Sequence, residues 1–98
     1  MSEIRESLDN LQGGKKWIKR MTRDGHGNMC ILGSLRSARM KKIIDLIAAE
    51  VRGHYPDRVL ILSQATASVA NFNDHPDTTF DDVRVVMEKA DLRLEEMV

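Results

Sequence analysis

The chain has 98 residues, of which 42% are hydrophobic and 31% are charged, and its formal net charge is zero. These values are typical of one folded domain, residues 1–98, and exclude an intrinsically disordered chain. The single cysteine excludes a disulfide framework and the multi-cysteine zinc modules. No apolar run approaches the roughly 18 residues of a membrane span, and the acidic N-terminus differs from a signal peptide. We therefore expect a cytoplasmic protein.

The charges are unevenly distributed along the chain. Residues 15–42 carry nine Lys or Arg and one acid, whereas residues 43–98 carry eleven Asp or Glu and five basic residues. If folding keeps these charges apart, the basic side forms a patch suited to an acidic partner. If folding mixes them, they are the solvated faces of ordinary helices. The isoelectric point of about 6.8 favours the second interpretation, because nucleic-acid-binding domains are usually far more basic.

The spacing of apolar residues predicts two helices in the first half of the chain. The first covers residues 3–12, with Ser2 as its N-cap. The second begins near Gly33 and ends at Gly53, and its apolar positions repeat at i, i+3, i+4, i+7 and i+8. Those positions are Met40, Ile43, Ile44, Ile47, Ala48 and Val51.

Two further helices are predicted in the second half. One covers residues 58–73, with Asp57 as its N-cap. The other begins after Thr79, which forms a capping box with Asp82. The apolar stripe of this last helix faces either the core or a second copy of the chain, which would give a homodimer. Its members are Phe80, Val83, Met87, Ala90, Leu94 and Met97.

A short β-hairpin is predicted near residues 17–32. A turn rich in Gly, Asp and Asn separates two runs of β-branched and large apolar residues, a pattern typical of hairpins. Two strands alone are marginally stable, so Trp17, Met21 and Cys30 are expected to anchor the hairpin on the helices. The expected fold is therefore mainly α, with about four helices around an aliphatic core and one short hairpin.

Residues 72–79 collect polar side chains around a proline-fixed bend. His75, between Asp74 and Asp77, could act as a general base or bind a divalent metal. A metal site needs three or four converging ligands, more than this segment supplies. Alternatively the segment is a linker, in which Asn73 caps one helix and Asp74 forms an Asx-turn. The linker interpretation explains these side chains except His75.

Cys30 is a further weak catalytic candidate. The N-terminus of the helix near Gly33 could activate its thiol as a nucleophile. The alternative is a buried thiol packed in the core, as is usual for free cysteines. Pairing with His26 lacks the Cys-x-x-Cys element of strong zinc signatures. We therefore assign no catalytic residue and no metal ligand, and expect no cofactor.

Basic side chains beside Trp17 form a candidate binding surface. Such groups next to an exposed aromatic ring can hold nucleic acid through phosphate contacts and base stacking. In a chain with only four aromatic residues, however, the core competes for this tryptophan. The candidate binding residues are Lys16, Lys19, Arg20, Arg23, Asn73, Asp74 and His75.

Several segments carry a family resemblance. They are Trp17, residues 23–27, the run 30–35 from Cys30 to Leu35, and residues 72–79 with Asp82-Val83. The chain resembles, over roughly residues 15–95, a family of small uncharacterised proteins from actinobacteria and their phages. Members commonly have Ala in place of Ser34. The resemblance implies an origin in an actinobacterium or one of its phages. The family has no assigned activity, so the resemblance identifies no catalytic residue.

Three functional hypotheses follow. The first is a non-enzymatic accessory protein, encoded by a phage or mobile element, that binds a host protein or itself. The second is a nucleic-acid-binding protein that uses the basic region 15–42. The third is a small metal-dependent or Cys/His hydrolase.

Overall fold

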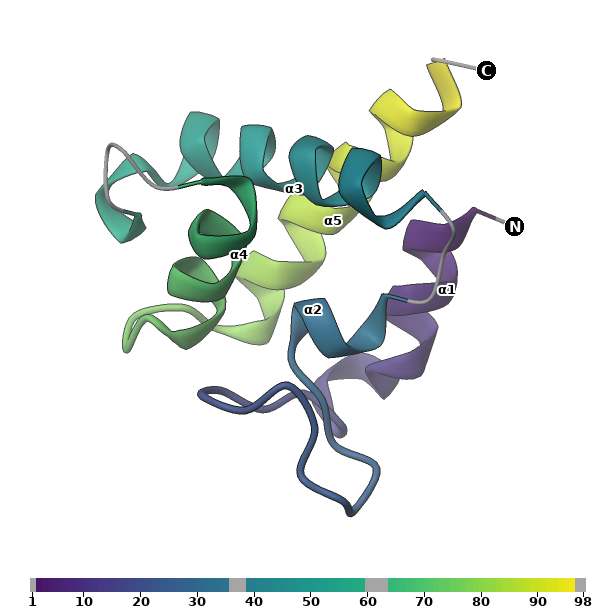
Figure 1. Cartoon of the computed structure of the whole chain (residues 1–98), viewed down its shortest axis with the longest axis vertical. Helices are drawn as coiled ribbons and strands as arrows, with labels where there is room; N and C mark the ends of the chain where they lie inside the picture. The colour runs from purple at the N-terminus through teal and green to yellow at the C-terminus, as the bar shows by residue number, and fades with distance from the viewer. Residues whose placement is uncertain (1, 36–38, 60–63, 97–98) are drawn as a thin grey trace.

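The computed structural model describes residues 2–35, 39–59 and 64–96 (Figure 1). Five α-helices and two 3-10 helices form this part of the chain, so the mainly helical class is confirmed. In chain order they are α1 (Glu3–Asn10), η1 (Gln12–Gly14), α2 (Ile31–Ser34), α3 (Met40–His54), η2 (Pro56–Arg58), α4 (Ala65–Asp74) and α5 (Phe80–Glu96).

The helices pack around α3 and α5, which lie against each other. α4 packs on α3, α1 packs on α5, and the short α2 contacts both α1 and α4 (Figure 1). The core is aliphatic except for one fully buried aromatic ring, Phe72. The stripe of α5 lies inside this core, with Val83, Met87, Ala90 and Leu94 buried, whereas Met97 lies outside the described residues. These side chains therefore stabilise the chain's own fold.

The first two predicted helices exist with shifted boundaries. Ser2 caps α1 as predicted, because its hydroxyl accepts a hydrogen bond from the backbone N–H of Arg5 at 3.0 Å. The long helix α3 begins at Met40 and not near Gly33. Gly33 instead belongs to α2, a separate single turn that packs against α1 and α4.

The prediction of one helix over residues 58–73 was wrong at its N-terminal end. Residues 56–58 form the 3-10 helix η2, Val59 is extended, and α4 begins at Ala65. Asp57 lies inside η2 and is not an N-cap. Within this segment Arg58 forms an ion pair with Asp82 of α5. The predicted residues 60–63 lie outside the described part of the chain.

The predicted hairpin was wrong, because the described residues contain no sheet. Two isolated bridges, from Met29 to Trp17 and to Arg23, are all that remains of the expected pairing. The turn closes on itself: the Asp24 carboxylate accepts hydrogen bonds from the backbone N–H groups of His26 and Asn28 and from the Asn28 side chain. These hydrogen bonds lower the pKa of Asp24, and the bond from the Asn28 side chain has the largest effect.

Thr79 and Asp82 form the predicted capping box at the start of α5. Asp82 Oδ2 accepts from the Thr79 N–H at 3.1 Å, and the Thr79 hydroxyl accepts from the Asp82 N–H at 3.3 Å. The same carboxylate accepts from Arg58 at 2.7 Å and from the Tyr55 hydroxyl at 3.3 Å. The Arg58 guanidinium lies 4.5 Å from the centre of the Tyr55 ring. One carboxylate thus joins η2 to the start of α5.

This arrangement predicts an acid-sensitive contribution to stability. Burial acts to raise the pKa of Asp82, but hydrogen bonds from Arg58 and Thr79 outweigh it and lower the pKa below the ordinary 3.8. The contribution is therefore fully present at pH values well above the ordinary pKa and is lost as the pH falls through the lowered pKa. At pH 7 we expect Asp82→Asn to reduce the free energy of unfolding by about 1–3 kcal/mol. Urea unfolding at pH 7 and at pH 2.5 measures this, and an equal loss at both values would contradict it.

Candidate functional site

Asn73 is the point at which distant segments of the chain meet. Its side chain is 1% exposed and lies in the last turn of α4. Its Oδ1 accepts hydrogen bonds from Trp17 Nε1 at 2.7 Å and from the Ile31 N–H at 3.1 Å. Its Nδ2 donates to the Ile18 carbonyl and to Asp74 Oδ1, both at 3.0 Å. All four hydrogen-bonding positions of the amide are therefore occupied, and we call this arrangement the Asn73 clip.

Neighbouring residues extend the clip along the segment that we call the 18–29 loop. Asp74 Oδ1 accepts from the backbone N–H of Arg20 at 2.7 Å, and Arg20 has a positive φ of 69°. Lys19 donates to the His75 carbonyl at 2.6 Å. Asn73 and Asp74 are therefore not the helix cap and Asx-turn that the sequence predicted. Both side chains instead hold a loop more than 50 residues away in sequence.

Trp17 is anchored from two sides. Its indole N–H is bound to Asn73, and its ring lies 5.9 Å from the ring of Phe80. Lys19 lies over the same ring, with its ammonium 5.5 Å from the centroid. Trp17 is therefore a structural anchor. This agrees with the alternative given above, in which the fold's own packing uses the tryptophan.

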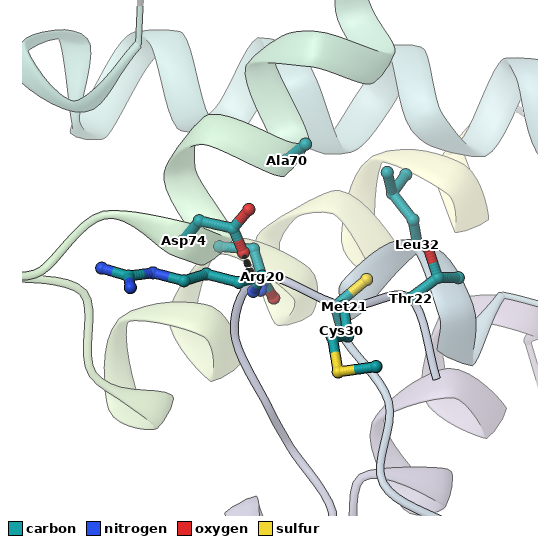
Figure 2. Close-up of a pocket in the computed structure, with 8 residues that line it drawn as sticks. Arg20, Met21, Thr22, Cys30, Leu32, Ala70 and Asp74 are labelled. Carbon is teal, nitrogen blue, oxygen red and sulfur yellow. Dashed lines mark hydrogen bonds between the residues drawn. The ribbon is translucent and has the colours of Figure 1, made fainter. Parts of the chain in front are cut away.

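A cavity of about 120 Å³ lies between the 18–29 loop and α4 (Figure 2). Figure 2 shows Ala70 on the α4 side, Leu32 and Thr22 opposite the Asp74 carboxylate, and the Arg20 side chain running past Asp74 and away from Cys30. Its lining residues are Arg20, Met21, Thr22, Cys30, Leu32, Ala70, Asn73 and Asp74.

Cys30 lines this cavity but is only 6% exposed. Its sulfur accepts a hydrogen bond from the Gly33 N–H at 3.4 Å, which makes it the N-cap of α2. The thiol is free, as the single cysteine requires. The prediction of a buried cysteine is confirmed, and the thiol has a structural role as a cap.

His75 has a structural explanation that the sequence did not suggest. Its Nδ1 accepts a hydrogen bond from the Asp77 backbone N–H at 3.1 Å, which closes the bend before α5. In the neutral ring the proton is then on Nε2. The ring lines a second cavity, of about 390 Å³, whose lining includes Asp57, Arg58 and Asp74.

The four catalytic candidates do not gather in one place. Cys30 lines the first cavity, His75 the second, Asp74 both, and Asp77 is exposed in the bend. Within residues 2–35, 39–59 and 64–96, no group of three His, Cys, Asp or Glu side chains could hold a metal ion. The Asp74 carboxylate and the His75 imidazole both have identified hydrogen bonds within the bend and the clip.

The four basic binding candidates divide into two pairs. Lys19 and Arg23 have structural partners: Arg23 donates to the Gly33 carbonyl at 3.1 Å and Lys19 to the His75 carbonyl. The side chains of Lys16 and Arg20 form no hydrogen bond or ion pair with the described residues, and Arg20 is exposed. Lys16 and Arg20 are therefore the basic candidates whose charged groups are available to a partner.

Sequence reasoning missed the long-range role of Asn73. The one available signal was that Trp17, Cys30 and residues 72–74 all belong to the pattern that carries the family resemblance. The structure brings these elements together, because Asn73 bonds to Trp17 directly and to the residue after Cys30.

Comparisons with known proteins place the chain in a family and go no further. The chain has no significant match among curated proteins or among solved structures. None of the helices in the described ranges is long and apolar enough to cross a membrane. One family model matches residues 4–92, a span that contains Trp17, Cys30, the Asn73 clip and most of α5. The chain therefore belongs to a family of unknown function, DUF6197.

Proposed function

We propose that this protein is a non-enzymatic accessory protein that binds a host protein through its 18–29 loop. In this proposal it acts in the cytoplasm of an actinobacterial cell and is encoded by a phage or mobile element. The actinobacterial or phage origin rests on the family resemblance. The observation that carries the proposal is the Asn73 clip, which ties both ends of an exposed loop to α4. A loop held in this way loses less conformational entropy on binding.

The loop composition supports a protein partner. Met21 is 53% exposed, and Arg20 and Arg23 lie close to it in the chain. Methionine and arginine are enriched in protein interfaces. An exposed thioether among guanidinium groups is thus a combination that interfaces favour.

The charge of the loop and of the residues just before it supports an acidic partner. Residues 15–23 contain five Lys or Arg and no acid. The nearest acid in sequence, Asp24, has its carboxylate bound within the turn. Complementary charge raises the rate of encounter and orients the partner.

Two features favour a different protein over a second copy or a nucleic acid. The apolar stripe of α5, which could have formed a homodimer, is buried in the chain's own core. Trp17, which could have stacked on a base, is bound to Asn73 and packed on Phe80. The structural roles of Asp74, His75 and Cys30 in turn support a non-enzymatic protein.

Photo-crosslinking in actinobacterial cells tests the proposal. A crosslinking amino acid at Met21 is expected to trap a defined protein, whereas the same group at Leu92, which is 59% exposed on α5, is not. We expect Lys16→Glu with Arg20→Glu to reduce the adduct about tenfold or more, because like charges now oppose each other. The exposed Lys89→Glu, a charge reversal on α5, is the matched control and should leave the adduct unchanged.

Three results would contradict this proposal. The first is equal crosslinking from positions 21 and 92. The second is an adduct that nuclease treatment removes, which would indicate nucleic acid. The third is an adduct that contains two copies of this chain.

A further inference from the structure

The cavity beside the 18–29 loop has the size of one aliphatic side chain. Its volume is about 120 Å³, and a protein cavity of roughly 150 Å³ is enough to bind benzene. Its apolar lining comes from Met21, Cys30, Leu32 and Ala70. Because Ala70 carries only a methyl group, α4 leaves space opposite the loop where a larger residue would fill it (Figure 2).

One polar group in the cavity has an unused hydrogen-bonding position. Asp74 Oδ1 accepts from the Arg20 N–H and from the Asn73 amide, but Oδ2 has no donor among the described residues. Figure 2 shows this second oxygen turned away from the Arg20 hydrogen bond. A backbone N–H of an incoming segment is the donor that suits a carboxylate at such a position.

The charge next to the cavity indicates which charge a partner segment should carry. The Arg20 side chain runs past Asp74 at the edge of the cavity, and it forms no ion pair with the described residues (Figure 2). The Asp74 charge is partly compensated by its two N–H donors. A segment that carries carboxylates beside its anchor is therefore favoured.

We infer that this cavity is a docking site for one aliphatic side chain of an acidic partner segment. The inference rests on the proposed function and makes it specific. The aliphatic side chain occupies the space between Ala70, Cys30 and Leu32. A backbone N–H of the segment donates to Asp74 Oδ2, and its carboxylates lie against Arg20.

Selection of displayed random dodecapeptides on the full-length protein tests the inference. The enriched peptides are expected to contain a Leu, Ile, Val or Met beside Asp or Glu. We expect Ala70→Leu, which fills the cavity, to weaken their binding about tenfold or more, and replacement of the aliphatic peptide residue by Ala to do the same. Ala67→Leu is the matched control, since Ala67 is exposed one helical turn away on α4. Thermal unfolding checks that each variant is folded, and Ala70→Val provides a smaller filling residue.

Cys30 supplies an independent readout. It is the single cysteine of the chain and lines the cavity, so a bound peptide is expected to slow its reaction with a thiol reagent several-fold. Peptides that bind folded Ala70→Leu and Ala70→Val as tightly as the native protein would overturn the inference. A selection that enriches no peptide would also overturn it.

The two proposals can fail separately. A Met21 adduct that persists in Ala70→Leu cells leaves the proposed function in place and removes the aliphatic anchor. Absence of the adduct from the native chain removes the proposed function itself.

Discussion

Replacing Gly33 with alanine is expected to reduce the free energy of unfolding by about 2–4 kcal/mol. A Cβ at this position would lie 2.1 Å from the Thr22 carbonyl oxygen, a backbone atom that cannot rotate away. Moving Thr22 weakens the hydrogen bond from the Cys30 N–H to that oxygen, now 3.1 Å. It also disturbs the bond from Arg23 to the Gly33 carbonyl. Urea unfolding followed by circular dichroism measures the loss.

Gly53→Ala is the matched control for this experiment. Gly53 lies in α3, and a Cβ there would meet nothing within 4 Å. Because alanine favours a helix more than glycine, this change is expected to stabilise the protein by about 0.5–1 kcal/mol. Equal effects of the two substitutions would show that the close approach of Gly33 to Thr22 does not exist in solution.

Asn73→Ala is expected to have an effect of similar size, about 2–4 kcal/mol of destabilisation. The truncation leaves three groups without their partner: Trp17 Nε1, the Ile31 N–H and the Ile18 carbonyl. Buried polar groups without a partner are costly, and here they also hold the loop. The fluorescence of Trp17, the single tryptophan, should report its altered environment, and amide hydrogen exchange in the 18–29 loop should accelerate.

Asn71→Ala serves as the control on the same helix. Its side chain is half-buried but forms no hydrogen bond with the described residues, so we expect a change within about 0.5 kcal/mol. Asn73→Asp distinguishes the role of the amide oxygen, which accepts hydrogen bonds, from that of the amide nitrogen, which donates them. The carboxylate can still accept from Trp17 and Ile31 but cannot donate to Ile18, and it adds a charge beside Asp74. Loss of less than 1 kcal/mol in both Asn73 variants would argue against the Asn73 clip.

Local patterns predicted most of the helical structure. Ser2 caps α1, the apolar repeat from Met40 to Val51 lies in α3, and Thr79 with Asp82 begins α5. These features depend on residues within a few positions of one another, so the sequence carries them directly. The same reasoning predicted a buried Cys30, because a free thiol is usually buried.

The errors came from segments whose partners are distant in sequence. Residues 17–32 have the alternation and turn of a hairpin, but their backbone bonds to Asn73 and Asp74 replace part of the expected strand pairing. Residues 56–58 form a separate 3-10 helix, in which Arg58 bonds to the distant Asp82. Helix and strand propensities contain no information about such contacts.

The sequence by itself determined the mainly helical class, the aliphatic core and the N-terminal ends of α1 and α5, since these follow from periodicity and capping over short distances. The tertiary structure alone decided the role of residues 72–75. A linker of caps and turns became the clip that holds the 18–29 loop, because the Asn73 amide finds donors and acceptors 42 to 56 residues away. It likewise decided that Trp17 is an anchor and that a cavity lies beside Ala70. Both depend on which segments folding brings together, and neighbouring residues do not specify that.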